Sequence, residues 1–444
     1  MAMGKRQPKQ GELFIPTDAI PEAPGHPFYR RLNALLADAG FDPFVEQLCL
    51  PCYAQDIGRP GIPPGTYFRM LFIGYFEGID SQRGIAWRCA DSRSLQQFLG
   101  CLPTEATPDH SSLTRLRKRL TEAVHENVFA FVLKLADAHG LLHARTVGVD
   151  STLLEANAAM KSLTRRDTGD DYKDFLRKLA AEAGLEDPTD EELVRFDRKR
   201  KGKTMSNADW ESPADPDSKI ARMKDGTTHL AYKAEHVVDL ETNLVLAAEI
   251  YEADRSDGGT VADSVLTAEI NVARAGGESG IEEVVADKGY HRLDVLAELK
   301  DEGYRTYIPE PEQVHDHVWI GKPEGQEEAY RGNRRRTRGA RSSRSKRLQK
   351  LRSEKVERTF AHVCETGGGR RSWLRGMENV SKRHLMQAAA HNLGIVMRKR
   401  FQVGTPRSLQ GAGKVLSALR ALQNALKHAI ALLRWVPRLA TMLG

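Results

Sequence analysis

The sequence is poor in cysteine and has no long uninterrupted hydrophobic segment. Five cysteines among 444 residues are too few and too scattered for a disulfide framework, which favours a reducing compartment. No stretch approaches the roughly 18 apolar residues that a membrane-spanning helix needs. The basic N-terminus, residues 1–10, lacks the apolar centre of a secretory signal peptide. We therefore expect a cytoplasmic protein with no membrane partner.

One pair of cysteines, Cys49 and Cys52, has the spacing of a metal or redox motif. A zinc site needs two more ligands at similar spacing, and none follows closely. Two small buried side chains are the simpler interpretation, and a metal or redox role is the alternative.

Glycine and proline are neither scarce nor abundant, which excludes collagen-like and wholly disordered chains. The charge excess is also small, 66 basic against 60 acidic residues, so the distribution of charge matters more than its sum. The length predicts about three units. We expect a flexible basic N-terminus at 1–20, a helical unit at 21–140, an α/β unit at 141–400 with a charged insertion at about 160–227, and a helical tail at 401–444.

A basic amphipathic helix is expected to begin at Asp109, near the end of the helical unit. Leu113 and Leu116 face inward in this pattern, whereas Arg115 and Arg119 face outward. Such a helix suits a DNA-reading helical pair, in which the outer arginines contact DNA. A solvated charged face on a packing domain explains the same pattern.

The segment from 145 to 310 changes to alternating strands and helices. Its patterns predict strands at 146–149, 231–238, 244–250, 283–286 and 305–308, and helices at 258–274 and 293–301. The second and third strands are expected to form a hairpin. This order predicts a mixed α/β sheet flanked by helices.

The strongest charge run covers residues 331–352, where arginine and lysine occur without any intervening acid. Such a block is typical of a polyanion contact, and Arg335 and Arg336 lie in its centre. Helices are expected at 345–363 and 381–400. A Leu/Ala-rich helix at 414–434 suits packing or oligomerisation.

Two aspartates follow apolar strands, Asp150 and Asp287. On neighbouring strands their carboxylates would repel one another, so one must be protonated or a cation must lie between them. Oxygen ligands favour Mg²⁺ or Mn²⁺. A third acid on a later helix would complete a two-metal site, but periodicity does not choose between Glu354 and Glu357. Each aspartate alone has a simpler explanation as a turn or helix cap.

Three segments that contain these acids resemble the motifs of a known family. They are Thr146-Val147-Gly148-Val149-Asp150-Ser151-Thr152, Val284-Val285-Ala286-Asp287-Lys288-Gly289-Tyr290 and Val356-Glu357-Arg358-Thr359-Phe360. They are similar to the acid motifs of bacterial insertion-sequence DDE transposases, with the IS-four/IS-five superfamily as the nearest group. Further similarity lies in Pro108–Leu113, Ala231–Ala234, Gly369–Arg371 and Asn392-Leu393, so that the resemblance spans roughly residues 20 to 400.

The resemblance implies an RNase H-like DDE catalytic domain at 141–400 behind an all-helical, DNA-binding N-terminal domain at 21–140. It also selects Glu357 as the third acid, so that Asp150, Asp287 and Glu357 would hold two Mg²⁺ (or Mn²⁺) ions. Activated water would cut the DNA at the ends of the element, and the freed 3′-OH would attack target DNA. The implied partners are double-stranded DNA, at both transposon ends and target, and at least one further copy of the chain.

Basic residues near these motifs are candidate phosphate contacts. They are Lys233, Lys288, Arg352, Arg358, Arg370, Arg371 and Arg375. Several relatives carry Tyr, Arg and Lys around the glutamate where this chain has Lys350, Ser353 and Cys364, and Arg352 and Arg358 are the candidates to substitute. Trp319 is expected to pack in its loop, with stacking on an unpaired base as the alternative.

Two other functions fit the same features. One is a catalytically inactive or repurposed DNA-binding protein of the same fold, which the substitutions at Lys350, Ser353 and Cys364 would suit. The other is an RNase H-like, metal-dependent nuclease that cuts without joining. Retention of all three acids favours an active enzyme over the first alternative.

Overall fold

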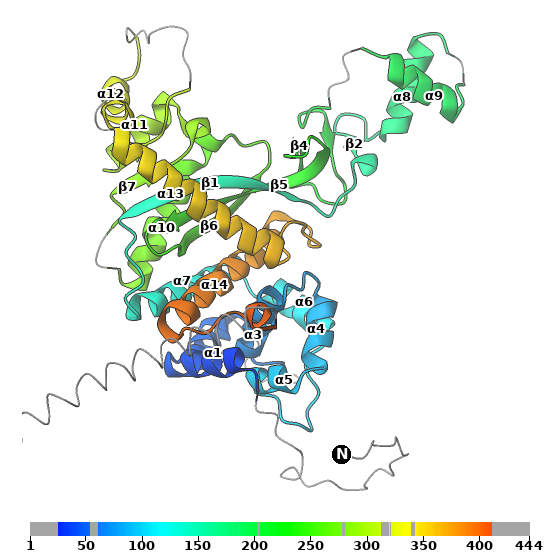
Figure 1. Cartoon of the computed structure of the whole chain (residues 1–444). Helices are drawn as coiled ribbons and strands as arrows, with labels where there is room; N and C mark the ends of the chain where they lie inside the picture. The colour runs from blue at the N-terminus through cyan, green and yellow to red at the C-terminus, as the bar shows by residue number, and fades with distance from the viewer. Residues whose placement is uncertain are drawn as a thin grey trace, which may run out of the picture.

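The structure is a computed structural model, and it describes residues 25–53, 61–185, 187–201, 205–277, 280–311, 319, 321–338 and 342–410. The first part of the chain is helical (Figure 1). It contains α1 (Pro27–Asp38), α2 (Phe41–Cys49), α3 (Pro64–Glu77), α4 (Gln82–Ala90), α5 (Arg93–Leu99), α6 (His110–Arg119) and α7 (Glu122–Ala138). Four of these helices begin where a side chain accepts a backbone N–H, namely at His26, Ser81, Ser92 and Asp109.

A six-stranded sheet follows. Its strands are β1 (Thr146–Glu155), β4 (Lys219–Arg222), β5 (Thr228–Asp239), β6 (Val245–Glu252), β7 (Glu283–Val285) and β8 (Arg305–Tyr307). The main order is β6-β5-β1-β7-β8, with β4 beside the start of β5. Strand β5 is antiparallel to β1 and β6, whereas β7 and β8 are parallel to β1. This arrangement, a hairpin on one side of the first strand and two parallel strands on the other, is the RNase H-like topology.

The first strand is longer than its apolar run predicts. It does not end at Asp150 but continues to Glu155, because β5 pairs with it over the whole distance from Val147 to Glu155. After Asp150, partly exposed residues alternate with buried ones along β1. The continuous apolar run therefore ends at Val149, although the strand itself continues. Asp150 therefore lies in the middle of β1, at the level where the shorter β7 ends.

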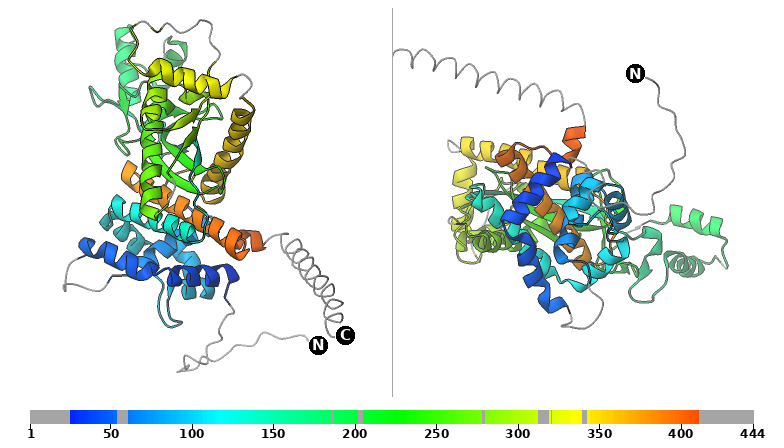
Figure 2. Two further views of the ribbon diagram at one scale, coloured as in Figure 1. Left: turned by 90° about the vertical axis from the view of Figure 1, so that its left-hand side faces the viewer. Right: turned by 90° about the horizontal axis from the view of Figure 1, so that it is seen from below.

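Helices cover both faces of the sheet (Figure 2). Alternate residues of β5 show which helix lies on which face: Glu235 contacts Ser264 on α10 (Val261–Ala275), whereas His236 contacts Thr359 on α13 (Ser342–Phe360). His236 also contacts α14 (Met377–Phe401) through His384, so α13 and α14 share one face. The remaining helices are α11 (Leu293–Asp301), α12 (Gln326–Thr337) and the short α15 (Pro406–Gln410).

Most expected elements of the α/β part are confirmed. The β5–β6 hairpin forms, α11 has the expected bounds, and α10, β7, β8 and α14 differ from expectation by a few residues at their ends. Helix α13 continues into a π-helical turn at Ala361–Thr366. The basic run 331–352 is divided between α12 and α13. The basic N-terminus at 1–20 and the helix expected at 414–434 lie outside the described residues.

The charged insertion between β1 and β5 forms an arm. It contains β2 (Thr164–Arg165), α8 (Tyr172–Glu182), α9 (Asp190–Lys199) and β3 (Trp210–Glu211), and it projects away from the body (Figure 1). Leu176, Ala180 and Leu193 form a small core of their own between α8 and α9. By contrast, one continuous hydrophobic core joins the N-terminal helices to the sheet and α14.

Helix α14 is buried along most of its length between the sheet and the N-terminal helices. Its residues include three consecutive alanines, Ala388–Ala390, and Gly394. These small residues allow neighbouring helices to approach closely. Of the helices in the described ranges, none has the length and hydrophobicity to cross a bilayer.

Candidate active site

The sheet register brings Asp150 and Asp287 to adjacent positions. Strands β1 and β7 pair in parallel, with Gly148 opposite Val285. Continued for two residues along each segment, this alignment reaches Asp150 on β1 and Asp287 just past the end of β7. Neighbouring strands of a sheet lie about 4.8 Å apart. Asp287 follows the end of β7 and caps the short helix Lys288–Tyr290, where its Oδ1 accepts the Gly289 N–H at 2.7 Å.

Asp150 already has a cationic partner. Arg352 on α13 donates to its Oδ2 at 2.6 Å, and the Ser151 N–H donates to its Oδ1 at 2.8 Å. Burial raises the pKa of the Asp150 carboxyl, and the nearby Asp287 raises it further, whereas Arg352 and the backbone N–H oppose this rise. The repulsion expected between two neighbouring carboxylates is thus present, and a guanidinium compensates for part of it.

Gly148 allows α13 to lie this close to β1. A β-carbon at this position would lie 2.7 Å from Leu240 Cδ2, 3.0 Å from Val356 Cγ2 and 3.1 Å from Arg352 Cγ. A larger residue at this position would therefore displace the side chains of Leu240, Val356 and Arg352.

The two candidate third acids on α13 differ in their partners. Glu354 forms an ion pair with Arg358 at 2.8 Å. Glu357 forms no ion pair among the described residues and accepts a hydrogen bond from the Ser353 hydroxyl at 2.8 Å. Glu354 also points more directly away from the sheet, because it lies about 160° around the helix from the buried Val356. Glu357 is therefore the acid that is free to take a new cation.

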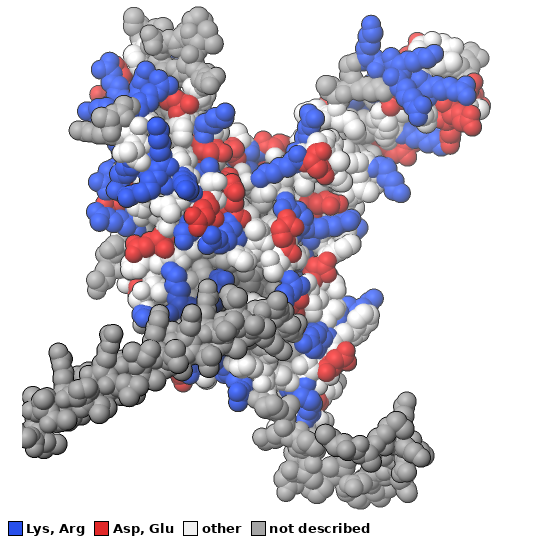
Figure 3. Space-filling view, viewed as in Figure 1, with Lys and Arg blue, Asp and Glu red and all other residues white. Residues whose placement is uncertain are grey.

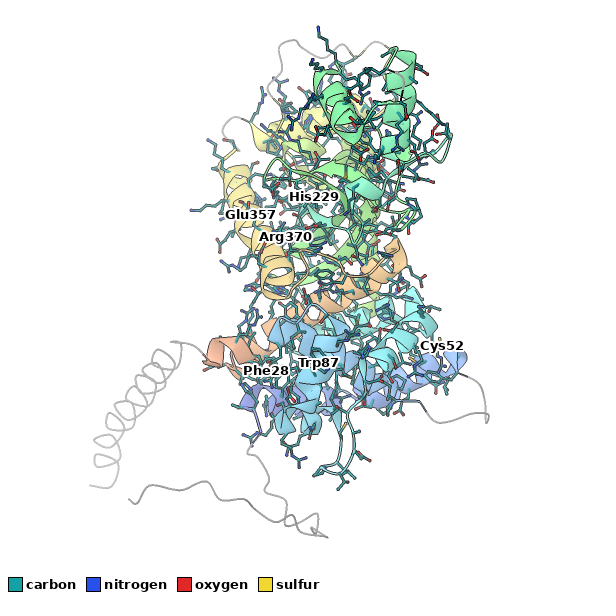
Figure 4. The ribbon with its side chains drawn as sticks, turned by 90° about the vertical axis from the view of Figure 1, so that its right-hand side faces the viewer. Phe28, Cys52, Trp87, His229, Glu357 and Arg370 are labelled. Carbon is teal, nitrogen blue, oxygen red and sulfur yellow. The ribbon has the colours of Figure 1, made fainter. Side chains whose placement is uncertain are left out.

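The three candidate acids do not lie close enough together to bind one metal ion. Within the described residues, no group of three His, Cys, Asp or Glu side chains is placed to hold a metal ion. Asp150 in the middle of β1 and Asp287 just past the end of β7 lie beside one another, and Glu357 lies exposed on the flank of α13, above Arg370 in Figure 4. A third ligand from α13 would need a change in its side chain or helix position.

The donor atoms nevertheless suit a hard divalent cation. In the described part of the chain, one carboxylate oxygen of Asp287 and one of Glu357 have no hydrogen-bond donor. The corresponding oxygen of Asp150 is held by a cation, Arg352. Carboxylate oxygens without softer ligands favour Mg²⁺ or Mn²⁺, so the residues fit such an ion.

A buried polar network lies behind the two aspartates, on the α10 face. Lys233 is only 3% exposed, and its Nζ lies 2.8 Å from both Asp257 Oδ1 and Thr260 Oγ1. Asp257 also accepts from the Ser151 hydroxyl at 2.9 Å, which joins the network to the residue after Asp150. Lys233 is therefore not available to phosphate, contrary to its expected role, because its amine is enclosed by these partners. Asp257 follows β6 in a short 3₁₀ turn and gave no signal in the sequence.

The other candidate DNA contacts fall into two groups. Lys288 and Arg335 are exposed and have no acidic partner in the described chain. The rest have partners: Arg336 donates to the Thr306 carbonyl, Arg352 pairs with Asp150, Arg358 with Glu354, Arg370 with Glu365 and Arg371 with Glu155, and Arg375 donates to the Asn157 carbonyl. On α6, Arg115 bonds to Ser111 and Arg119 lies over the Tyr53 ring at 5.0 Å.

Two tryptophans near the candidate site differ in their surroundings. Trp319 packs against Tyr330, with ring centres 5.2 Å apart, as its packing interpretation predicts. The more exposed ring is Trp373, which is 46% accessible in the loop after α13. Its indole N–H donates to Asp80 at 2.8 Å, and the Arg371 guanidinium lies 4.7 Å from its ring centre. A lone tryptophan in a polar, glycine-rich loop gave no sequence signal for this position.

The cysteine pair gives no evidence of a metal or redox site. Cys49 is buried and Cys52 half-buried, and both are free thiols. Burial, reinforced by the neighbouring Cys52, raises the pKa of Cys49 to about 11, so its reactive thiolate is scarce at neutral pH.

Comparison with known families agrees with this geometry. A transposase domain of the DUF772 type matches residues 16–119, and a transposase DDE domain matches residues 189–393. Among solved structures, a piggyBac transposase synaptic complex with hairpin DNA is similar at 11% identity over 86% of this chain and 84% of that chain. The TM-score of 0.22 is too low to establish a shared fold, which rests on the strand order instead. No curated protein gives a significant match.

The strand order and the two neighbouring aspartates on β1 and after β7 define an RNase H-like phosphoryl-transfer enzyme. The chain belongs to the DDE-type insertion-sequence transposases. Its function is DNA transposition, in which it cleaves and transesterifies phosphodiester bonds, and its family uses divalent metal ions. An inactive DNA-binding protein or a simple nuclease is not favoured by these matches.

Proposed function

We propose that the chain binds the two ends of an insertion element, cuts them and joins them to target DNA. The observation that supports this most directly is the pairing of β1 with β7, which aligns Asp150 with Asp287. Glu357 on α13 supplies the third carboxylate, and we propose that the three acids together hold two Mg²⁺ ions. Bound divalent ions would neutralise charge on the reacting phosphate and activate the attacking oxygen.

The residues of the chain hold and orient the reactants. In the first step water attacks a phosphodiester at the element end, the P–O3′ bond breaks, and the 3′-oxygen leaves as a hydroxyl. In the second step that 3′-OH attacks a phosphodiester of target DNA, and a target 3′-OH leaves. The number of phosphodiester bonds is conserved in the joining step, so no external energy source and no covalent enzyme intermediate are needed.

Arg352 is suited to change partners during this cycle. Without divalent ions it neutralises Asp150 at 2.6 Å. Cations bound by the same carboxylate would release its guanidinium toward the phosphate that is being cut. We propose Lys288 and Arg335 as further phosphate contacts, together with Arg115 and Arg119 on α6 for binding of the element end. Two ends must meet in one complex, so we propose a homodimer on DNA, which acts in the cytoplasm at the nucleoid.

A cleavage and strand-transfer assay tests the assignment. The substrate is a duplex that carries the terminal sequence of the element, with Mg²⁺ present. Asp150→Asn, Asp287→Asn and Glu357→Gln are expected to abolish cutting and joining while leaving DNA binding largely intact. Glu354→Gln is the matched control on the same helix, because Glu354 is already paired with Arg358. Activity in Glu357→Gln and its loss in Glu354→Gln would show that the third acid is wrongly assigned.

A further inference from the structure

Five cations of the run 331–352 form ion pairs with acids of the same chain, so part of the positive charge of this run is neutralised internally. Figure 3 shows lysine and arginine gathered over α12 and the start of α13, with acidic side chains among them. Arg331 pairs with Glu327, Arg334 and Arg338 with Glu310, Arg344 with Glu283, and Arg352 with Asp150. These arginines form ion pairs inside the protein. They therefore contribute less to the binding of DNA than their number suggests.

A small set of cations in this run is left over. In the part that the structure describes, Arg335 on α12 and Lys346, Arg347 and Lys350 on α13 are exposed and form no ion pair. Of the cations in the run, these four can therefore take a new phosphate partner without first breaking an internal salt bridge. The three on α13 lie on the helix that also carries Glu357.

The three cations on α13 lie along two different rows on the surface of the helix. Lys346, Lys350, Ser353 and Glu357 are spaced by four, three and four residues, which keeps them within about 60° of one another around the helix. We call these four residues the α13 ridge. Arg347 lies about 80° away from Glu357, on a line with Glu354. Along the axis, Lys350 is about 10 Å and Lys346 about 16 Å from Glu357.

The α13 ridge is next to the edge of the sheet from which Asp287 emerges. Gln349 lies between the ridge and the sheet, and its amide donates to the Ala286 carbonyl at 2.9 Å and the Tyr307 carbonyl at 2.7 Å. Ala286 is the residue before Asp287. Gln349 therefore fixes this flank of α13 against the carboxyl ends of β7 and β8, so that the ridge leads from two free lysines to the acids.

We infer that Lys346 and Lys350 bind backbone phosphates of the DNA strand that is cut, and so direct its scissile phosphate to Glu357 and Asp287. This inference rests on the proposed function, which it deepens by naming residues that position the strand. Both lysines are positioning residues, since they touch phosphates away from the reacting atoms. Their point charges suit sequence-independent backbone contacts, which fix register but do not read bases.

The test compares Lys346→Gln/Lys350→Gln with Arg347→Gln in the full chain. Binding to a duplex with the element end is measured by fluorescence anisotropy between 50 and 200 mM salt, with EDTA to prevent cutting. Each lost phosphate contact lowers the slope of log K against log salt by about 0.9, so the double variant should lose about 1.8. When salt is raised from 50 to 200 mM, the fold-decrease in affinity of the wild type should therefore be about 12 times that of the double variant. Arg347→Gln should change the slope much less.

A second readout is the position of the cut, mapped on a sequencing gel with saturating protein and Mg²⁺. The double variant should cut more slowly and at neighbouring positions, whereas Arg347→Gln should cut at the wild-type position. Equal salt slopes and equal cut positions for the two variants would overturn the inference while the wild type still cuts. A wild type that binds the end but never cuts with any divalent ion would instead overturn the proposed function. Equal melting temperatures for the three proteins show that folding is unaffected.

Discussion

Replacing Arg352 by glutamine tests the electrostatics of the site without requiring any catalytic activity. Arg352 is 11% exposed and Asp150 22%, and their atoms are 2.6 Å apart. Removing one partner of a fully buried pair costs about 3–5 kcal/mol, because the other charge stays buried and unpaired. Asp150 retains some contact with water and the Ser151 N–H. We therefore expect a cost of roughly 1.5–3 kcal/mol in the free energy of unfolding.

The assay is urea unfolding at pH 7 in EDTA, applied to the two single variants Arg352→Gln and Asp150→Asn and to the double variant. Because both single changes break the same ion pair, their effects on the free energy of unfolding should not add, and we expect a coupling of about 1–2 kcal/mol. Additive costs would show that the ion pair has no energetic role and would refute the reasoning.

Mg²⁺ gives a second, independent result. If divalent ions bind beside Asp150, they replace the charge that Arg352→Gln removes. At 100 times its dissociation constant, an ion that binds only the folded state stabilises it by about 2.7 kcal/mol. Mg²⁺ should therefore raise the stability of Arg352→Gln more than that of the wild type, which must first release Arg352. An equal gain in both proteins would argue against a shared position for ion and guanidinium.

The pH dependence has a definite sign. The folded pKa of Asp150 is raised, so the folded state holds its proton to higher pH than the unfolded state does. Stability therefore falls as pH rises from the ordinary aspartate pKa, near 3.9, through the folded value. Loss of Arg352 raises the folded pKa further, so Arg352→Gln should lose stability more steeply between pH 4 and pH 7 than the wild type.

Three further outcomes can be measured by similar unfolding experiments. Burial and the nearby Glu126 raise the pKa of Glu249 to about 7, so the stability of the protein should fall as pH rises from about 4.5 to 7. At pH 8, Glu249→Gln should be more stable than the wild type by about 2–3 kcal/mol. At pH 4 the two proteins should be equally stable. Burial lowers the pKa of His384 to about 4, so stability should fall as pH drops from 6.5 to 4, and His384→Gln should weaken this dependence in acid titrations. Gly148→Ala should cost about 1–3 kcal/mol and slow DNA cleavage, because its methyl group displaces the side chains of Leu240, Val356 and Arg352; unchanged stability would contradict the close contact.

Local patterns were sufficient for much of the catalytic fold. The β5–β6 hairpin and helix α11 follow from alternation and helical periodicity within short windows, so they could be predicted without long-range information. The length of β1 could not, because residues after Asp150 gain their strand conformation from pairing with β5, which is more than 70 residues away in the chain.

The candidate site shows the same division. Asp150 and Asp287 could be predicted, since each follows an apolar run. The roles of the basic residues could not, because Lys233 is buried by Asp257 and Arg344 is neutralised by Glu283, and such contacts depend on the folded sheet. Sequence position alone therefore could not separate arginines that hold the protein together from lysines that are free to bind DNA.

The central place of β1 in the sheet has a consequence for damaged copies of the gene. This strand alone joins the β5–β6 hairpin to the parallel β7–β8 pair, although it precedes both in the chain. A polypeptide started by an internal codon beyond residue 155 would therefore lose Asp150 and would leave two separate sheet fragments with bare hydrogen-bonding edges. Such a fragment would aggregate or be degraded, so it would not persist as a dominant-negative inhibitor that occupies the element ends.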